Sequence, residues 1–251
     1  METLRGRHAV VTGASRGIGL AIARALRAHG ARVTLMAREA RVLEAAAAEL
    51  GGETAWQTVD VTDAEGVAAA FARAGAVDIL VNNAGQAASA PFGRTDAALW
   101  QRMLDVNLTG AYHCMQAALP GMLDAGWGRV VNVASTAGLT GYRYVAAYCA
   151  AKHGLVGLTR ALALEVATRG VTVNAVCPGF TDTDIVADAV ANIVRKTGRT
   201  ADEARAELAA GNPQGRLVRP DEVAHAVAWL CMPGAAALNG QAIAVAGGEV
   251  M

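Results

Sequence analysis

The chain has 251 residues, of which 53% are hydrophobic and 18% are charged, and its 22 basic side chains balance its 22 acidic ones. This composition excludes extended disorder, and the length suits one large domain or two small ones. We expect no nucleic-acid partner, because phosphate backbones require clustered positive charge and the chain carries no basic block. No run of 18 or more residues is continuously apolar, so we expect no membrane span.

The four cysteines, Cys114, Cys149, Cys177 and Cys231, lie far apart in the sequence. They form neither a Cys-x-x-Cys pair nor a set with histidine at ligand spacing, so we expect no metal site. Isolated thiols are typical of a reducing compartment, and the apolar run near the N-terminus is too short for a secretory signal. Together these features predict a cytoplasmic protein.

Short, nearly continuous apolar runs alternate along the chain with longer segments of helical period, as is typical of buried parallel strands joined by helices. The expected strands are 8–12, 32–37, 55–59, 78–81, 129–134, 171–176 and 242–246. The expected helices include 17–29, 38–50, 96–119 and 144–168. Because right-handed crossovers place helices on both faces, the pattern predicts an α/β fold: a single doubly wound Rossmann-type domain over residues 1–251, with a seven-stranded parallel sheet.

Several helix boundaries are also visible in the sequence. Thr62-x-x-Glu65 and Thr200-x-x-Glu203 have the spacing of capping boxes, in which each end of the motif binds a free backbone N–H of the other. Gly30 and Gly170 follow expected helices, where a glycine in the left-handed region commonly ends the last turn. We therefore expect helices to begin near residues 63 and 201.

Residues 180–219 interrupt the alternation, because no strand appears where the pattern predicts one. The apolar residues of this segment fall on one helical stripe: Ile185, Val186, Val190, Ile193 and Val194. A second helix follows at 201–210. An ordinary helix pair packed on the core would satisfy this pattern. Insertions in open α/β sheets tend to lie at the carboxyl ends of strands, where ligands bind, so we expect residues 180–219 to form a helical substrate lid.

A glycine-rich turn, Thr12-Gly13-Ala14-Ser15-Arg16-Gly17-Ile18-Gly19, follows the first expected strand and opens the first expected helix. Glycines allow a tight turn here and let the backbone approach a diphosphate at the positive end of the helix. A plain strand-to-helix turn is the alternative, and the spacing differs from the Gly-x-Gly-x-x-Gly fingerprint. At every fixed position it matches the turn of the short-chain dehydrogenase/reductase family, so the chain resembles that family.

The resemblance extends over nearly the whole chain. Asp60-Val61 matches the family's adenine contact, Asn82-Asn83-Ala84-Gly85 matches the end of its fourth strand, and Pro178-Gly179 with Thr183 matches the segment beside the nicotinamide. The cofactor-binding residues that the resemblance implies are Gly13, Ser15, Arg16, Gly17, Ile18, Gly19, Arg38, Asp60, Val61, Asn83, Ala84, Gly85, Tyr148, Lys152, Pro178, Gly179 and Thr183. One departure is Ala246, where relatives often carry an acidic residue, and this bears on C-terminal packing more than on catalysis.

Asn107, Ser135, Tyr148 and Lys152 match the family's catalytic tetrad in order and spacing. Tyr148 and Lys152 are four residues apart on an expected helix, so they share a face, and an adjacent ammonium is expected to lower the phenol pKa from about 10. An ordinary surface pair and a helix-capping serine are the alternatives. The resemblance implies that Ser135 and Tyr148 contact the substrate together with Phe180, that Tyr148 transfers the proton, and that Asn107 holds a relay water.

The end of the second expected strand bears on the choice of cofactor. An acidic residue there would bind the ribose 2′-hydroxyl of NAD, whereas arginine binds the 2′-phosphate of NADP. The chain has Ala37 at the acidic position, followed by Arg38, and Arg16 lies in the glycine turn. These two cations favour NADP(H), while Glu39 leaves NAD(H) open.

The resemblance is to 3-oxoacyl thioester reductases and polyketide ketoreductases in particular, at residues 148–157 and 174–180. It implies a short-chain NAD(P)-dependent enzyme that interconverts a 3-oxoacyl and a 3-hydroxyacyl thioester, and a homotetramer. Residues 121–128 contain no Lys or Arg, which favours coenzyme A over an acyl carrier protein. One alternative substrate is a small secondary alcohol, ketone, sugar or cyclic diol, and a further alternative is a non-catalytic dinucleotide-binding protein.

Overall fold

Within residues 3–251 the protein contains one seven-stranded sheet in which all neighbouring strands run parallel. Its structure is a computed structural model that describes residues 3–251. The strands are β1 (His8–Thr12), β2 (Arg32–Ala37), β3 (Thr54–Thr58), β4 (Ile79–Asn82), β5 (Gly128–Val133), β6 (Val171–Pro178) and β7 (Ala242–Val245). Their order is β3-β2-β1-β4-β5-β6-β7, so the winding reverses between β1 and β4. The predicted doubly wound sheet is confirmed, and such sheets bind ligands where the order reverses.

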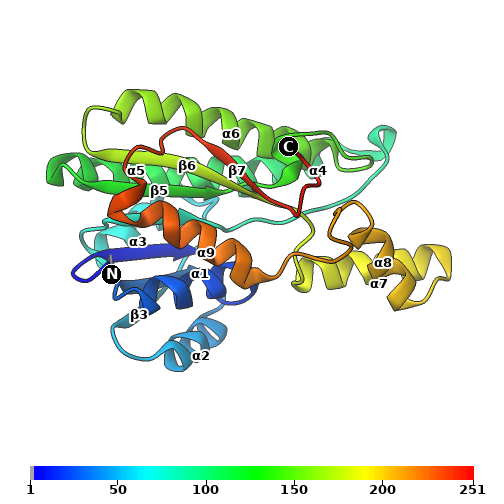
Figure 1. The fold of residues 1–251 in the computed structure, drawn as a ribbon, viewed down its shortest axis with the longest axis horizontal. Helices are drawn as coiled ribbons and strands as arrows, with labels where there is room; N and C mark the ends of the chain where they lie inside the picture. The colour runs from blue at the N-terminus through cyan, green and yellow to red at the C-terminus, as the bar shows by residue number, and fades with distance from the viewer. Residues whose placement is uncertain (1–2) are drawn as a thin grey trace.

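Helices cover both faces of this sheet. Those on the sheet are α1 (Gly17–Ala28), α2 (Ala40–Leu50), α3 (Ala64–Ala74), α4 (Ala97–Leu104), α5 (Gly110–Ala125), α6 (Ala146–Val166) and α9 (Pro220–Cys231). Two further helices, α7 (Asp184–Thr197) and α8 (Ala201–Ala209), lie beyond the end of β6. Figure 1 shows α5 and α6 on one side of the strands and α1 and α2 on the other. No helix within residues 3–251 is long and apolar enough to span a bilayer.

Successive residues of the strands supply two hydrophobic cores, because side chains alternate across a strand. In β1, Ala9 and Val11 belong to the core that packs against α1, α2 and α9, whereas Val10 belongs to the core that packs against α3, α5 and α6. All five residues of β1 are buried. Covering both faces explains why the strands read as continuous apolar runs.

Two of the four predicted helix boundaries are confirmed. The Thr200–Glu203 capping box is present at the start of α8, and Gly30 follows the last turn of α1 with a φ of 93°. The Thr62 prediction is wrong: Asp63 caps α3 by accepting from the Gly66 N–H at 3.1 Å, because the Thr62 hydroxyl is bound to Asp60 at 2.8 Å. Gly170 is four residues past the end of α6, so it belongs to the turn before β6.

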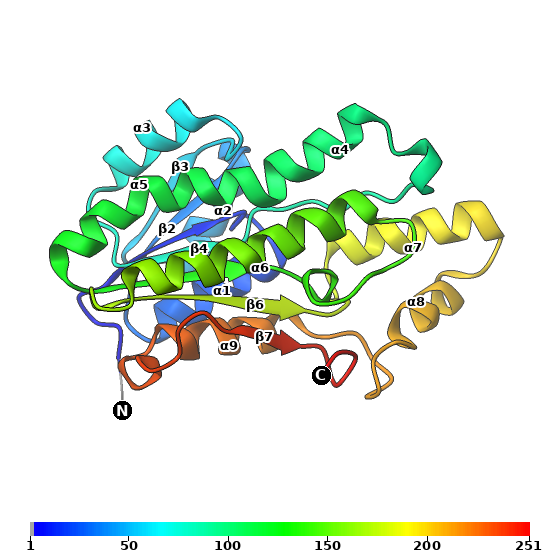
Figure 2. The ribbon, with the colours of Figure 1, turned by 90° about the horizontal axis from the view of Figure 1, so that it is seen from above.

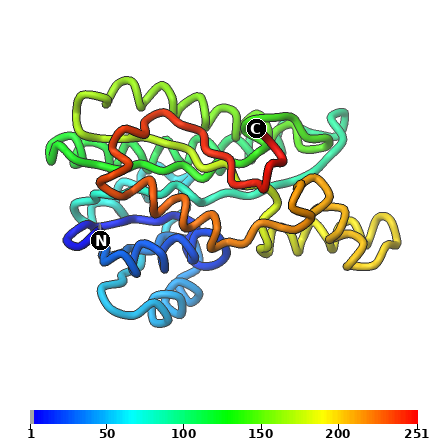
Figure 3. Tube along the Cα trace, in the orientation of Figure 1, coloured from blue at the N-terminus to red at the C-terminus, as the bar shows by residue number. Residues whose placement is uncertain are grey.

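Residues 180–219 leave the sheet at the carboxyl end of β6 and return to begin α9 (Figure 3). Their ends are joined by backbone hydrogen bonds, because the Val218 N–H donates to Phe180 O and the Asp182 N–H donates to Val218 O, both at 2.9 Å. Between these ends α7 and α8 pack on a small core of their own, made by Val186, Val190 and Ala204. The segment is thus an insertion with a closed base.

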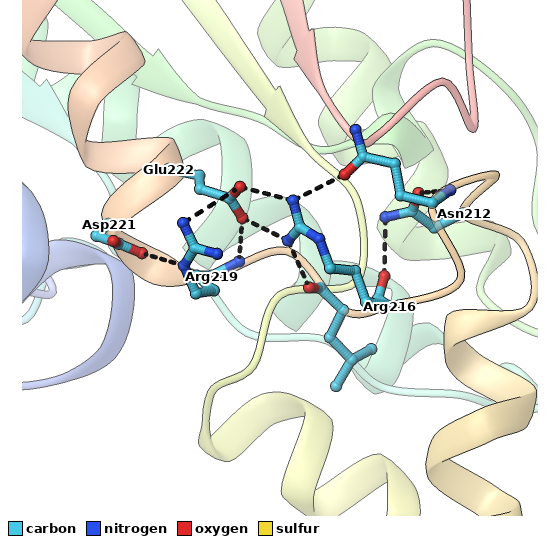
Figure 4. A network of polar contacts seen from close by, with 7 residues as sticks. Asn212, Arg216, Arg219, Asp221 and Glu222 are labelled. Carbon is cyan, nitrogen blue, oxygen red and sulfur yellow. Dashed lines mark hydrogen bonds and ion pairs between the residues drawn. The ribbon is translucent and has the colours of Figure 1, made fainter.

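A polar cluster fixes the returning end of this insertion to α9 (Figure 4). Arg216 donates from both terminal nitrogens to the Glu222 carboxylate, at 2.8 and 2.7 Å, and the Arg219 N–H donates to the same carboxylate at 2.8 Å. These bonds hold the pKa of Glu222 at about 2. Asn212 joins the cluster by donating to the Arg216 carbonyl at 2.8 Å.

Candidate active site

Two adjoining cavities lie at the carboxyl ends of the central strands. The larger, of about 430 Å³, is bounded by the glycine turn, the ends of β5 and β6, and α7. The smaller, of about 190 Å³, lies beside the ends of β2 and β3. Both are lined by Gly13, Arg16, Gly85 and Gln86. The two cavities therefore form one elongated cleft at the point where the strand order reverses.

The glycine turn forms the floor where the cavities meet. A Cβ on Gly13 would lie 2.8 Å from the Cα of Ala84, and a Cβ on Gly19 would collide with the Gly13 carbonyl oxygen. Asn83 fixes the turn by donating to the carbonyl oxygens of Thr12 and Gly13, at 2.9 and 3.1 Å. This close packing leaves the N-terminal N–H groups of α1 as a donor site for a diphosphate, so the turn fits the group expected there.

The smaller cavity contains the residues predicted to bind the adenosine end of the cofactor. Its lining includes Ser15, Arg16, Arg38, Asp60, Val61 and Ala84. Two guanidinium groups thus border one small cavity, with Glu39 as the acidic neighbour. The pKa of Asp60 is lowered, chiefly because its carboxylate accepts the Thr62 backbone N–H at 3.0 Å.

The four predicted catalytic residues, Asn107, Ser135, Tyr148 and Lys152, line the larger cavity together. Ser135 directly follows the residue after β5, and its side chain is hydrogen-bonded to that of Tyr148. Lys152, one turn further along α6, donates to the Val133 carbonyl at 2.9 Å, and its Nζ lies 5.7 Å from the centroid of the Tyr148 ring. The strand end and the helix face thus bring a hydroxyl, a phenol and an amine to one wall.

Asn107 reaches this wall through a break in the helix predicted for residues 96–119. A π-helical turn, Asp105–Thr109, separates α4 from α5 and contains the buried Asn107. Its amide donates to Gln86 O at 2.9 Å, and its Oδ1 accepts the Gln86 N–H at 3.2 Å. A Cβ on Gly85 would lie 2.8 Å from Asn107 Oδ1 and 3.6 Å from Lys152 Nζ, so Gly85 lies between these two polar groups.

The expected lowering of the Tyr148 pKa is not found. Burial raises the pKa of Tyr148 to about 12, although the hydrogen bond with Ser135 acts in the opposite direction. Burial also lowers the pKa of Lys152 to about 8. The physical reason is that both groups lose solvation, which disfavours phenolate and ammonium alike. At neutral pH the Tyr148 phenol is therefore protonated.

The remaining predicted residues complete the larger cavity. Gly17, Ile18, Gly19 and Asn83 line it on the side of the glycine turn, and Pro178, Gly179, Phe180 and Thr183 line it on the side of β6 and α7. Ala246 is buried, and a Cβ on Gly179 would lie 3.2 Å from its methyl group. These contacts indicate that Ala246 has a packing role, as expected.

The cavity also contains residues that sequence reasoning missed. Tyr142 lines it from the loop before α6, and Gln86 lines both cavities directly after the Asn-Asn-Ala-Gly motif. Asp184, the first residue of α7, forms an ion pair with Arg16 across the cleft. Tyr142 could have been predicted from its position in the sequence, because the loop that carries it connects Ser135 to the helix that carries Tyr148.

Comparison with known proteins agrees with this geometry. A family model described as short chain dehydrogenase matches residues 7–193. The chain is 43% identical to a putative ketoacyl reductase of Streptomyces coelicolor, covering 99% of this chain and 98% of that protein. It is 42% identical to a cis-4-hydroxycyclohexanecarboxylate dehydrogenase of Sinomonas cyclohexanicum, covering 98% of each. Among solved structures it is similar to a single-substitution variant of the actinorhodin polyketide ketoreductase with NADPH, with a TM-score of 0.94 and 42% identity over 99% of both chains. The chain therefore belongs to the short-chain dehydrogenase family of oxidoreductases.

Proposed function

We propose that this protein interconverts a ketone and a secondary alcohol with a nicotinamide dinucleotide, and that Asn107, Ser135, Tyr148 and Lys152 are its catalytic residues. The observation that carries the proposal is their convergence on one wall of a cavity whose floor is the glycine turn. A bound nicotinamide supplies the hydride in reduction and accepts it in oxidation. The protein supplies the binding geometry and the proton.

The proton is moved by the hydroxyl pair. Ser135 and Tyr148 are hydrogen-bonded to each other, so both can contact one carbonyl oxygen. Because burial keeps the Tyr148 phenol protonated, it donates its proton as negative charge develops on that oxygen during reduction. Lys152, with a pKa of about 8, is the titratable group on the same helix face, and Asn107 is the next polar group beyond Gly85. In this proposal Lys152 returns a proton to Tyr148, and a water held by Asn107 supplies that proton from solvent.

The preferred cofactor in this proposal is NADP(H). Arg16 and Arg38 border the smaller cavity, where a 2′-phosphate would be held by charge-assisted hydrogen bonds. Ala37, which also lines that cavity, offers no carboxylate to bind a ribose hydroxyl. NAD(H) remains the second candidate, because Glu39 is another lining residue and its carboxylate can accept from such a hydroxyl.

The proposed substrate is a 3-oxoacyl or 3-hydroxyacyl thioester, carried by coenzyme A in preference to an acyl carrier protein. Ile185 and Val186 of α7 line the larger cavity and give it an apolar wall suited to an acyl chain. We propose that residues 180–219 act as the substrate lid. A small cyclic alcohol is the second candidate, because a relative at 42% identity is named as a dehydrogenase of a hydroxylated cyclohexane ring.

The proposed assembly is a homotetramer. Trp100 of α4, Tyr112 of α5 and Leu164 of α6 are exposed, and Leu164 has 82% of its surface accessible. These helices lie beside one another on one face of the sheet, as Figure 2 shows. Large apolar side chains gathered on one face favour contact with further copies of the chain. Sedimentation of the purified protein tests this, since a monomer at micromolar concentration would contradict it.

The activity is tested by following NADPH consumption with acetoacetyl-CoA and a panel of small linear and cyclic ketones. We expect turnover by the unaltered chain, and Tyr148→Phe is expected to keep cofactor binding while losing about 10²- to 10⁴-fold in turnover. Tyr144→Phe, on an exposed neighbour, is the matched control and should leave turnover unchanged. Cofactor binding without turnover of any ketone would favour the non-catalytic alternative, and normal rates in Tyr148→Phe would overturn the assignment of the acid.

A further inference from the structure

Two aromatic side chains, Tyr142 and Phe180, line the larger cavity and form what we call its aromatic wall. Tyr142 belongs to the loop before α6, and Phe180 follows the Pro178-Gly179 turn. Their ring centroids are 6.3 Å apart with an interplanar angle of 82°, an edge-to-face contact. Ser135 and Tyr148 line the same cavity, so a substituent of a carbonyl group bound there is within the space that this aromatic wall borders.

The hydroxyl of Tyr142 is bound at two points of the protein. It lies 2.5 Å from Glu249 Oε1 and 2.9 Å from Thr136 Oγ1. A carboxylate only accepts hydrogen bonds, so the phenol proton points to Glu249 and the Thr136 hydroxyl donates to the phenol oxygen. Burial, together with the bond to Glu249, raises the pKa of Tyr142 to about 12. Tyr142 is therefore neutral at working pH, and its ring rather than its hydroxyl is the group available to a substrate.

Glu249 comes from the far end of the sequence, 107 residues from Tyr142. It follows β7 and a turn in which Gly247 and Gly248 both have positive φ, 62° and 96°. A Cβ on Gly179 would lie 2.6 Å from Glu249 Oε2, and one on Gly211, just after α8, would lie 3.5 Å from Oε1. Glu249 thus lies between the lid and the Pro178-Gly179 turn, with its carboxylate on the back of the aromatic wall.

We propose that Tyr142 is a specificity-determining residue that contacts the substrate, and that Glu249 is the positioning residue that holds its ring against Phe180. The class of substituent that this wall accepts is uncharged and apolar, such as an acyl chain or a carbocyclic ring. An anionic substituent would be repelled, because only the Tyr142 ring separates it from the Glu249 carboxylate. The inference deepens the proposed function and rests on it.

Three properties distinguish positioning from a general loss of structure. Removing the tether leaves the hydroxyl–phenol–amine set in place, so the KM of a large ketone should rise while kcat changes little. A small ketone that does not reach the wall should be unaffected. Glutamine retains an accepting Oε1 at position 249, so Glu249→Gln should recover most of what Glu249→Ala loses.

The experiment compares butanone with the N-acetylcysteamine thioester of 3-oxooctanoate, using Tyr142→Phe, Glu249→Ala, Glu249→Gln and the double variant Tyr142→Phe/Glu249→Ala. We expect the ratio of kcat/KM values, thioester over butanone, to fall about tenfold in each of Tyr142→Phe and Glu249→Ala, since each loses one charge-assisted hydrogen bond. The double variant should be no worse than either, because both remove the same bond. Tyr144→Phe and Glu44→Ala, on exposed side chains, are the matched controls.

The possible outcomes distinguish failure of the proposed function from failure of the proposal about Tyr142 and Glu249. An unaltered chain that reduces neither ketone overturns the proposed function and this inference with it. An active chain whose ratio is unchanged in Tyr142→Phe, or whose double variant shows additive losses, overturns the inference alone. NADPH affinity and the thermal midpoint of each variant are measured alongside, and Tyr142→Phe with Glu249→Gln decides the matter if Glu249→Ala does not fold.

Discussion

The guanidinium of Arg16 and the carboxylate of Asp184 form an ion pair between the glycine turn and the first residue of α7, with Nε and Oδ2 3.2 Å apart. The two side chains are 71% and 65% exposed, so the pair contributes little to stability. Arg16 also lines the smaller cavity beside Arg38. Asp184 therefore competes with a 2′-phosphate for the Arg16 guanidinium, which is expected to bind that phosphate.

Loss of the Arg16 charge should change cofactor preference. In Arg16→Ala we expect the KM for NADPH to rise about tenfold to a hundredfold, because a charge-assisted hydrogen bond to the 2′-phosphate is lost. The KM for NADH should change little. Steady-state kinetics with both cofactors measures this. Arg24→Ala is the control, since Arg24 is an exposed arginine of α1, the helix that Arg16 precedes, and it pairs with Glu49. Equal losses with both cofactors would contradict the role of Arg16 in phosphate recognition.

Neutralising Asp184 should have the opposite effect. Asp184→Asn removes a carboxylate that competes for the Arg16 guanidinium and repels a phosphate, so the affinity for 2′,5′-ADP should rise by about threefold to tenfold at low salt. AMP, which lacks the 2′-phosphate, should bind as before. Titration calorimetry with both nucleotides gives the comparison, and Asp188→Asn, further along α7, is the control. Tighter binding of both nucleotides would mean that the carboxylate acts on the lid rather than on the phosphate site.

The floor of the cleft should not tolerate a single added methyl group. A Cβ on Gly19 would collide with the Gly13 carbonyl oxygen and the Asn83 amide, so Gly19→Ala must displace the turn. We expect NADPH binding, followed by quenching of intrinsic fluorescence, to weaken at least about tenfold. Gly121→Ala is the matched control, because nothing lies within 4 Å of a Cβ there, and helix propensity favours alanine. Unchanged NADPH binding in Gly19→Ala would show that the turn can move to accommodate the methyl group, which would contradict this prediction.

Stability should fall on the acid side of neutrality because of His8. Its ring is buried and bound on both sides, by Ala76 O at 2.7 Å and Thr34 Oγ1 at 2.8 Å. Burial is the main cause of its lowered pKa, with Arg32 acting in the same direction and Asp78 in the opposite one. The unfolded chain therefore binds a proton below about pH 6.5 that the folded chain does not, and the free energy of unfolding decreases as pH falls through that value.

Urea unfolding of the unaltered chain and His8→Gln between about pH 5 and 8 checks the sign. The variant is less stable at neutral pH, but its dependence on pH should be shallower. His225→Gln, at an exposed position on α9, should keep the slope of the unaltered chain. A variant at position 8 with an undiminished slope would point to other titrating groups.

The arrangement of the sheet and the cleft was predictable because both depend on local patterns. Apolar runs give parallel strands, parallel strands place their carboxyl ends on one edge, and motifs that follow strands therefore meet there. Ser135 after β5 and Pro178 at the end of β6 are found beside the glycine turn for this reason. The predicted residues of the cofactor and catalytic sets all line one or other of the two cavities.

Features that depend on contacts between distant residues, or on burial, could not be predicted from the sequence. The bond between Tyr142 and Glu249 joins residues 107 positions apart, and no spacing announces it. The direction of the Tyr148 pKa was wrong because four-residue spacing reveals the nearby amine but not the loss of water around both groups. Thr62 was mistaken for a cap because the competing acceptor, Asp60, is evident only once the turn is folded.

The backbone bonds that join the two ends of the 180–219 insertion at Phe180 and Val218 have a consequence for engineering. Its two ends lie side by side, so the distance that a replacement segment has to span is fixed by the rest of the fold. Residues 185–210 lie between Thr183, which lines the cavity, and the Asn212–Arg216 part of the polar cluster, so they can be exchanged as one unit. If this segment is the substrate lid proposed above, replacing it with another helical hairpin is expected to change which substrates are accepted while leaving the predicted catalytic residues in place.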